Sequence, residues 1–100
     1  ERPYRLSQAD AKIAQAEAQI LQYKQEQLQA QADKERRGFE YNRKLGLFTS
    51  PKGALVSKDE VEQADRDYKL AVAQVELAEA KVQFGEKTLR EAEEQKRVFD

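Results

Sequence analysis

In the second half of the chain, large and small apolar residues recur at alternating intervals of three and four positions. The repeat comprises Val61, Ala64, Tyr68, Ala71, Val75, Ala78 and Val82, and continues through Gly85, Leu89 and Ala92 to Lys96 and Phe99. This spacing places one stripe along one side of an α-helix and is typical of a coiled-coil seam. It predicts a helix over about residues 57–98. Gly85 costs a helix about 1 kcal/mol relative to alanine, and its place on the small side of the seam favours close packing there.

The first half of the chain carries a similar but less regular repeat. Its seam begins with Leu6, Ala9, Ile13, Ala16, Ile20 and Tyr23. The repeat weakens where the polar residues Gln27 and Lys34 occupy the next large positions. We expect Leu28, Ala32 and Phe39 to take over the apolar role there, followed by Tyr41, Leu45 and Phe48. The pattern predicts a first helix over about residues 6–46.

Helix-breaking residues concentrate near the midpoint of the chain. Pro51 and Gly53 disfavour a continuous helix, and they predict a tip loop over about residues 47–56. Ser57 and Glu60 directly follow with the spacing of a capping box, which marks the start of a helix. The two helical segments are nearly equal in length, so antiparallel folding covers both seams. We expect residues 1–100 to form a single all-α domain, two long antiparallel helices that make a coiled-coil hairpin with a tip loop.

Each predicted helix has a second apolar stripe outside its seam. The bulky members are Leu21 and Leu28 in the first helix and Leu70, Leu77 and Phe84 in the second. The accompanying alanines need no partner, because alanine is a strong helix former. The five bulky residues are different, since a two-helix hairpin has only one internal interface. They predict lateral packing of several hairpins side by side.

The composition restricts the chemistry that the chain can perform. It has no histidine and no cysteine, which removes the usual general base and transition-metal ligands. Its 18 basic and 19 acidic residues give no basic excess for binding nucleic acid. The carboxylates sit among lysines and arginines at ion-pair spacing, for example Asp65 and Lys69. We expect no enzyme activity, no cofactor, no metal and no direct insertion of this segment into a membrane. The absence of a starting methionine suggests a segment of a longer protein.

The tip loop has two possible roles. Leu47, Phe48, Leu55 and Val56 surround its polar turn. They can simply close the end of the hairpin, or they can dock a partner at the end of the two helices.

Two segments carry a family resemblance, one from the loop into the second predicted helix and one further along that helix. Residues 52–64 (KGALVSKDEVEQA) and the alanine-rich run 71–78 (AVAQVELA) resemble the start of the second hairpin helix in periplasmic adaptor proteins, the membrane fusion proteins of the HlyD, AcrA and MacA kind. The resemblance is most specific over residues 43–82. It implies a hairpin that bridges an inner-membrane transporter to a TolC-type outer-membrane channel in a tripartite efflux pump or type I secretion system. It also implies a homo-oligomer, a hexamer, in the periplasm, with the transporter contacts and membrane anchor outside this segment.

The resemblance also implies contact residues at the tip. The family contacts its channel through an Arg, a Leu and a Ser with the spacing R-x3-L-x6-S. Arg43 and Leu47 match the first spacing, and Ser57 matches by its place before Lys58. Nine residues separate Leu47 from Ser57 instead of six, so Leu45 or Leu55 are alternatives for the leucine. Phe48 and Leu55 are expected to support the contact.

Two other interpretations of the sequence remain. The chain could be a generic coiled-coil arm of a cytoplasmic protein, such as a synthetase arm or a chaperone hairpin. It could also be an assembly hairpin that only dimerises.

Overall fold

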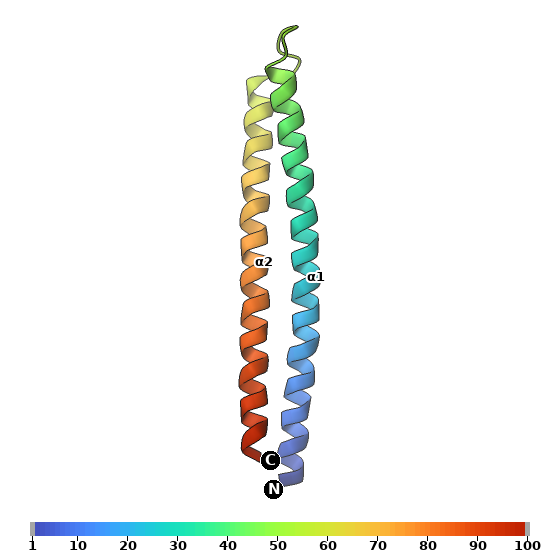
Figure 1. Cartoon of the computed structure of the whole chain (residues 1–100), viewed down its shortest axis with the longest axis vertical. Coiled ribbons are helices and arrows are strands. Elements are labelled where there is room, and N and C mark those ends of the chain that lie inside the picture. The colour runs from blue at the N-terminus through green and yellow to red at the C-terminus, as the bar shows by residue number, and fades with distance from the viewer. Residues whose placement is uncertain (1, 100) are drawn as a thin grey trace. The chain divides into compact units, whose positions relative to one another are not determined.

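The computed structural model describes residues 2–99, and it describes side chains from residue 4 to residue 98. Two α-helices make up the fold: α1 spans Arg2–Phe48 and α2 spans Lys58–Phe99 (Figure 1). The helices pack against each other, and the described part of the chain contains no strand. The predicted all-α hairpin of two antiparallel helices is therefore confirmed.

The helix ends follow local chemistry. Helix α1 begins at Arg2, four residues before the predicted start, because a proline is tolerated in the first turn, where its missing N–H would have no partner. Helix α2 begins at Lys58 with Asp59 and Glu60 in its first turn and Lys96 and Arg97 in its last. These charges oppose the partial charges of the helix dipole. The tip loop observed between the helices comprises residues 49–57.

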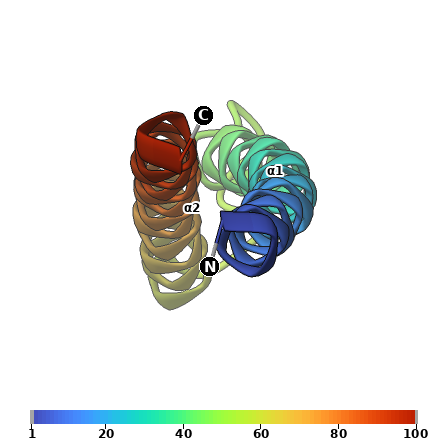
Figure 2. The same cartoon turned by 90° about the horizontal axis from the view of Figure 1, so that it is seen from below.

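The chain divides into two compact units. The terminal unit contains the described residues up to 27 and from 78 onward, and the loop unit contains residues 28–77. Within each unit, a segment of α1 lies beside a segment of α2, as the end-on view also shows (Figure 2).

In the terminal unit, both helices contribute buried residues to the seam. Ala9, Ala16 and Ile20 of α1 are buried, as are Ala78, Val82 and Gly85 of α2. A Cβ placed on Gly85 would lie 3.1 Å from Cγ1 of Ile20 and 3.3 Å from Cδ2 of Tyr23. Because Gly85 has no side chain, Ile20 and Tyr23 can pack against it where the two helices approach closely. Ion pairs between Lys96 and Asp10 (2.7 Å) and between Lys81 and Glu26 (4.0 Å) follow the antiparallel order.

In the loop unit, the buried residues come from α2 alone. Ala64, Ala71 and Val75 are buried, and Ala71 is only 1% exposed. The residues of α1 that share the seam are half-buried: Ala30, Lys34, Arg37, Tyr41, Lys44 and Phe48. Gly38 makes room for the ring of Tyr68, whose Cε1 atom lies 3.1 Å from the position of a Cβ on that glycine.

One prediction about this seam is wrong. Leu28 is 59% exposed and Phe39 is 81% exposed, and Ala32 is exposed as well. They do not replace Gln27 and Lys34, which remain on the half-buried side of α1. The reason is geometric: α1 is uninterrupted, so its heptad phase continues whatever residue falls on the seam. Long polar side chains tolerate this position because their alkyl stems can lie along apolar surface.

Candidate docking site at the tip loop

The tip loop has a defined backbone conformation. The N–H of Gly53 donates to the carbonyl of Ser50 over 3.0 Å, which closes a turn with Pro51 at its second position. The N–H of Lys52 donates to Oγ of Ser50 at 3.3 Å. Gly53 has a φ of 103°, a left-handed conformation that glycine adopts without a steric penalty. Proline fixes the turn at one end, and glycine permits the change of direction at the other.

Backbone hydrogen bonds also attach the loop to the end of α1. The N–H of Leu55 donates to the carbonyl of Leu47 at 3.0 Å, so the two predicted contact leucines are directly connected. Thr49 donates to the carbonyl of Leu45 through both its N–H (3.0 Å) and its hydroxyl (2.9 Å). Phe48 and Val56 are half-buried at this junction, whereas Leu55 is 65% exposed. The loop therefore holds an apolar side chain in solvent on a fixed backbone.

Ser57 caps the start of α2. Its Oγ accepts the N–H of Glu60 at 3.1 Å, and its carbonyl accepts the N–H of Val61 at 3.3 Å. These contacts satisfy backbone donors of the first helical turn. The side chain is exposed, and its hydroxyl hydrogen can still donate to a partner. Ser57 can therefore serve the helix and an external acceptor at the same time.

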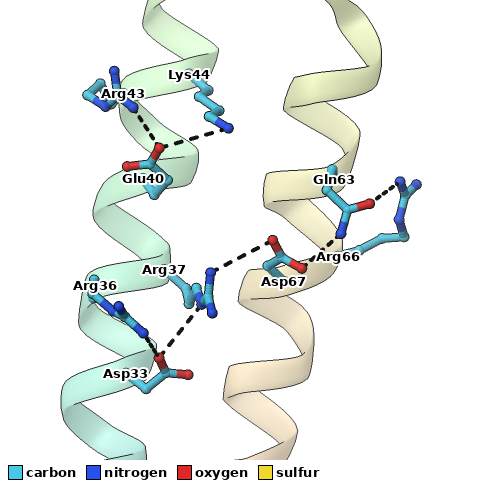
Figure 3. Close-up of polar contacts among 9 residues, drawn as sticks. All are labelled: Asp33, Arg36, Arg37, Glu40, Arg43, Lys44, Gln63, Arg66 and Asp67. Atoms are coloured by element: carbon cyan, nitrogen blue, oxygen red, sulfur yellow. Dashed lines mark hydrogen bonds and ion pairs between the residues drawn. The ribbon is translucent and has the colours of Figure 1, made fainter.

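Arg43 is held by a neighbouring carboxylate on α1. Its Nη2 atom donates to Oε1 of Glu40 at 2.6 Å, and Nζ of Lys44 lies 3.9 Å from the same oxygen (Figure 3). The hydrogen bond from Arg43, reinforced by the positive charges of Arg43 and Lys44, lowers the pKa of Glu40 below its ordinary value. The same hydrogen bond raises the pKa of Arg43. The Arg43 side chain is 59% exposed, so another anion can reach the guanidinium.

The predicted contact residues all belong to the loop unit, but they are not joined into one cluster. Leu47 and Leu55 share a hydrogen bond. Arg43 lies one helical turn before Leu47, with its guanidinium engaged by Glu40. Within the described residues, no hydrogen bond or ion pair joins Ser57 to Arg43 or to either leucine.

The residues predicted for lateral assembly are all exposed. Leu28, Leu70 and Leu77 in the loop unit and Leu21 and Phe84 in the terminal unit have exposed fractions between 58% and 65%. None of these side chains is used by the seam of its unit.

A polar network in the loop unit was not predicted. Asp33 accepts from Arg36 at 2.6 Å and lies 3.7 Å from Nε of Arg37, whose Nη1 atom lies 3.9 Å from Oδ2 of Asp67 on α2. Asp67 then accepts from Gln63 (2.9 Å), which accepts from Arg66 (2.9 Å) (Figure 3). The spacing of Asp33 and Arg36 could have indicated the first pair. The pair Arg37–Asp67 between the helices could be predicted only from a heptad phase that places Arg37 on the seam.

A surface hollow beside Phe39 was also missed. It measures about 400 Å³ and is lined by Lys34, Glu35, Gly38, Phe39, Asn42 and Tyr68. The same heptad phase that places Lys34 on the seam turns Phe39 outward, so a correct phase would have revealed this exposed ring.

The structure offers no sign of a metal centre or a membrane span in the residues that it describes. No group of acidic side chains between residues 2 and 99 is arranged to hold a metal ion. Neither helix, over the same range, has a stretch apolar enough to cross a bilayer. No family model matches the chain, and no curated protein or solved structure is detectably similar to it.

Proposed function

We propose that this chain is the α-helical hairpin of a periplasmic adaptor and that its tip loop docks onto a TolC-type outer-membrane channel. In this role the hairpin bridges the channel to an inner-membrane transporter, which is contacted by domains outside this segment. The segments 52–64 and 71–78 suggest the family. The observation that carries the docking role is Leu55, an apolar side chain that is 65% exposed on a hydrogen-bonded loop.

A fixed loop favours docking for an energetic reason. Binding a partner orders side chains and loops at the interface, and this ordering costs free energy. The hydrogen bonds from Gly53 to Ser50 and from Leu55 to Leu47 already order this backbone before any partner arrives. Arg43, in the last two turns of α1, and Ser57, the last residue of the loop, add a cation and a hydroxyl donor. A partner surface with an apolar recess and hydrogen-bond acceptors around it fits this set.

The test is photo-crosslinking in cells of the full-length protein, with the reactive residue at Leu47 or at Leu55. We expect a crosslink to an outer-membrane channel. The same reactive residue at Gln22, an exposed position of α1 in the terminal unit, is the matched control and should not reach the channel. Crosslinks from the loop positions only to cytoplasmic proteins would overturn the proposal and favour a coiled-coil arm.

Export measurements separate docking from folding. Leu55→Arg changes an exposed side chain and keeps the backbone N–H that bonds to Leu47. It should abolish export while leaving the helical content unchanged. Phe39→Arg makes a similar apolar-to-charged change at another exposed position of the loop unit and should retain export. Normal export and normal channel association with Leu55→Arg would refute the docking role.

Lateral assembly of several hairpins, in a hexamer, completes the proposal. Its support is the exposure of the five bulky residues Leu21, Leu28, Leu70, Leu77 and Phe84. Exposed apolar stripes of this kind mark protein contacts. Site-directed crosslinking at Leu70 and Leu77 in the intact assembly should join neighbouring copies. The absence of such crosslinks would exclude the lateral contact.

A further inference from the structure

We propose that the two helices of the loop unit separate and close again within the folded protein, and that raised ionic strength promotes this opening. The helices of the terminal unit stay paired under the same conditions. This inference is independent of the proposed function.

The first argument is the difference in burial between the units. In the terminal unit, each helix contributes three buried seam residues. In the loop unit, no residue of α1 is buried, and α2 contributes only Ala64, Ala71 and Val75. Burial of apolar area is the main favourable term in helix pairing, at about 25 cal/mol per Å². Local opening is favoured where such burial is sparse.

The second argument is the polarity of the α1 seam. Lys34, Arg37 and Lys44 occupy seam positions, where a coiled coil is stabilised by apolar residues. Arg37 has Asp67 as a partner on α2, whereas Lys44 pairs with Glu40 on its own helix. Lys34 forms no ion pair with any described residue. Among the described residues of the loop unit, the pair Arg37–Asp67, at 3.9 Å, is the only ion pair that joins the two helices.

The third argument gives the direction of the salt effect. Residues 34–44 of α1 contain five basic and two acidic residues, and residues 59–69 of α2 contain two basic and five acidic residues. The two facing segments therefore carry opposite net charge, and their mutual attraction supports the pairing. Between about 0.01 M and about 1 M salt, the Debye length falls from about 30 Å to about 3 Å. Screening weakens this attraction. The terminal unit also has two ion pairs between its helices, Lys96–Asp10 and Lys81–Glu26, but its pairing rests in addition on buried apolar residues from both helices, which salt does not screen.

Opening has a measurable consequence for the backbone amides. Most helix stability in proteins comes from packing, so an unpaired segment loses helical hydrogen bonds more often. Amide hydrogen exchange, followed by mass spectrometry on the whole chain, reports this segment by segment. We expect faster exchange in residues 30–48 and 58–75 than in residues 9–23 and 80–92. Raising the salt should accelerate exchange several-fold in the loop unit and by a clearly smaller factor in the terminal unit.

Two variants test the mechanism. Lys34→Leu places an apolar side chain on the seam and should slow exchange in the loop unit by roughly tenfold. Lys24→Leu makes the same change at an exposed position of α1 and should not slow it. Asp67→Asn removes the charge that attracts Arg37, and it should accelerate exchange and reduce the salt dependence. Equal exchange rates in the two units, no response of the loop unit to salt, or equal effects of Lys34→Leu and Lys24→Leu would each overturn the proposal.

Discussion

Gly85 provides a sharp test of how closely the helices of the terminal unit pack. Replacing it with alanine adds one methyl group, 3.1 Å from Cγ1 of Ile20 and 3.3 Å from Cδ2 of Tyr23. Ile20 is buried, and the phenol oxygen of Tyr23 accepts a hydrogen bond from Gln19 at 3.0 Å, so neither neighbour moves without loss. Overpacking of this kind costs about 1–3 kcal/mol. The gain in helix propensity is about 1 kcal/mol, so Gly85→Ala should be destabilising by about 0–2 kcal/mol.

Gly46→Ala supplies the matched control. Gly46 also lies in a helix, but a Cβ there would meet nothing within 4 Å. The substitution should therefore stabilise the chain by about 0.5–1 kcal/mol through backbone propensity alone. Urea unfolding followed by circular dichroism measures both changes, and a difference of 1 kcal/mol moves the melting temperature by about 4–8 °C in a domain of this size. If Gly85→Ala stabilises the protein as much as Gly46→Ala, the contact at Gly85 is not close and the reasoning fails.

A double-mutant cycle identifies the responsible neighbour. Ile20→Ala opens space beside Gly85, and the methyl group of Gly85→Ala can then occupy part of it. The two changes together should be less destabilising than their sum by at least about 0.5 kcal/mol, as expected for residues in contact. Simple additivity would mean that Ile20 does not restrict position 85.

Three further predictions concern the loop unit. Ser57→Ala removes the cap on Glu60 N–H and should lower the free energy of unfolding by about 1 kcal/mol, whereas Ser57→Asp should retain it; urea unfolding distinguishes them. Gly53→Ala forces a Cβ into a backbone with φ of 103° and should destabilise the chain by about 1–2 kcal/mol, opposite in sign to Gly46→Ala. The lowered pKa of Glu40 means that its ion pair with Arg43 contributes stability above the ordinary pKa of 4.5 and loses it as the pH falls through the lowered pKa. Arg43→Gln should raise this pKa in an NMR titration, and an unchanged value would show that Arg43 is not its cause.

The sequence predicted features that depend on local chemistry or on a regular repeat. The cap at Ser57 follows from a hydroxyl placed three residues before Glu60, and the observed hydrogen bond has this geometry. The close approach at Gly85 followed from its place in a clean heptad. The predicted shift of the α1 seam to Leu28, Ala32 and Phe39 is wrong, because an uninterrupted helix keeps its heptad phase even where a polar residue falls on the seam. Tyr41 and Phe48, which the sequence also predicts for the apolar role, are half-buried. The apolar character of Phe39 alone predicts it on the seam, but its position in the heptad exposes it.

The candidate site likewise contains some contacts that the sequence can predict and others that it cannot. The hydrogen bond between Leu47 and Leu55 joins backbone atoms eight positions apart, and no side-chain pattern encodes it. The contact of Arg37 with Asp67 depends on the relative register of two helices, which the repeat alone leaves open by whole heptads. The pairing of Arg43 with Glu40 has ordinary helical spacing, and it could have been predicted from the sequence.

The attachment of the tip loop through backbone atoms has a consequence for how this protein can change over time. Ser50, Gly53, Leu47 and Leu55 fix the loop largely through N–H and carbonyl groups, which every residue except proline possesses. The side chain at position 55 extends into solvent and takes no part in these bonds. Substitutions there can therefore alter what the loop recognises without disturbing the backbone that presents it. The same property makes the position suited to displaying foreign side chains in protein engineering.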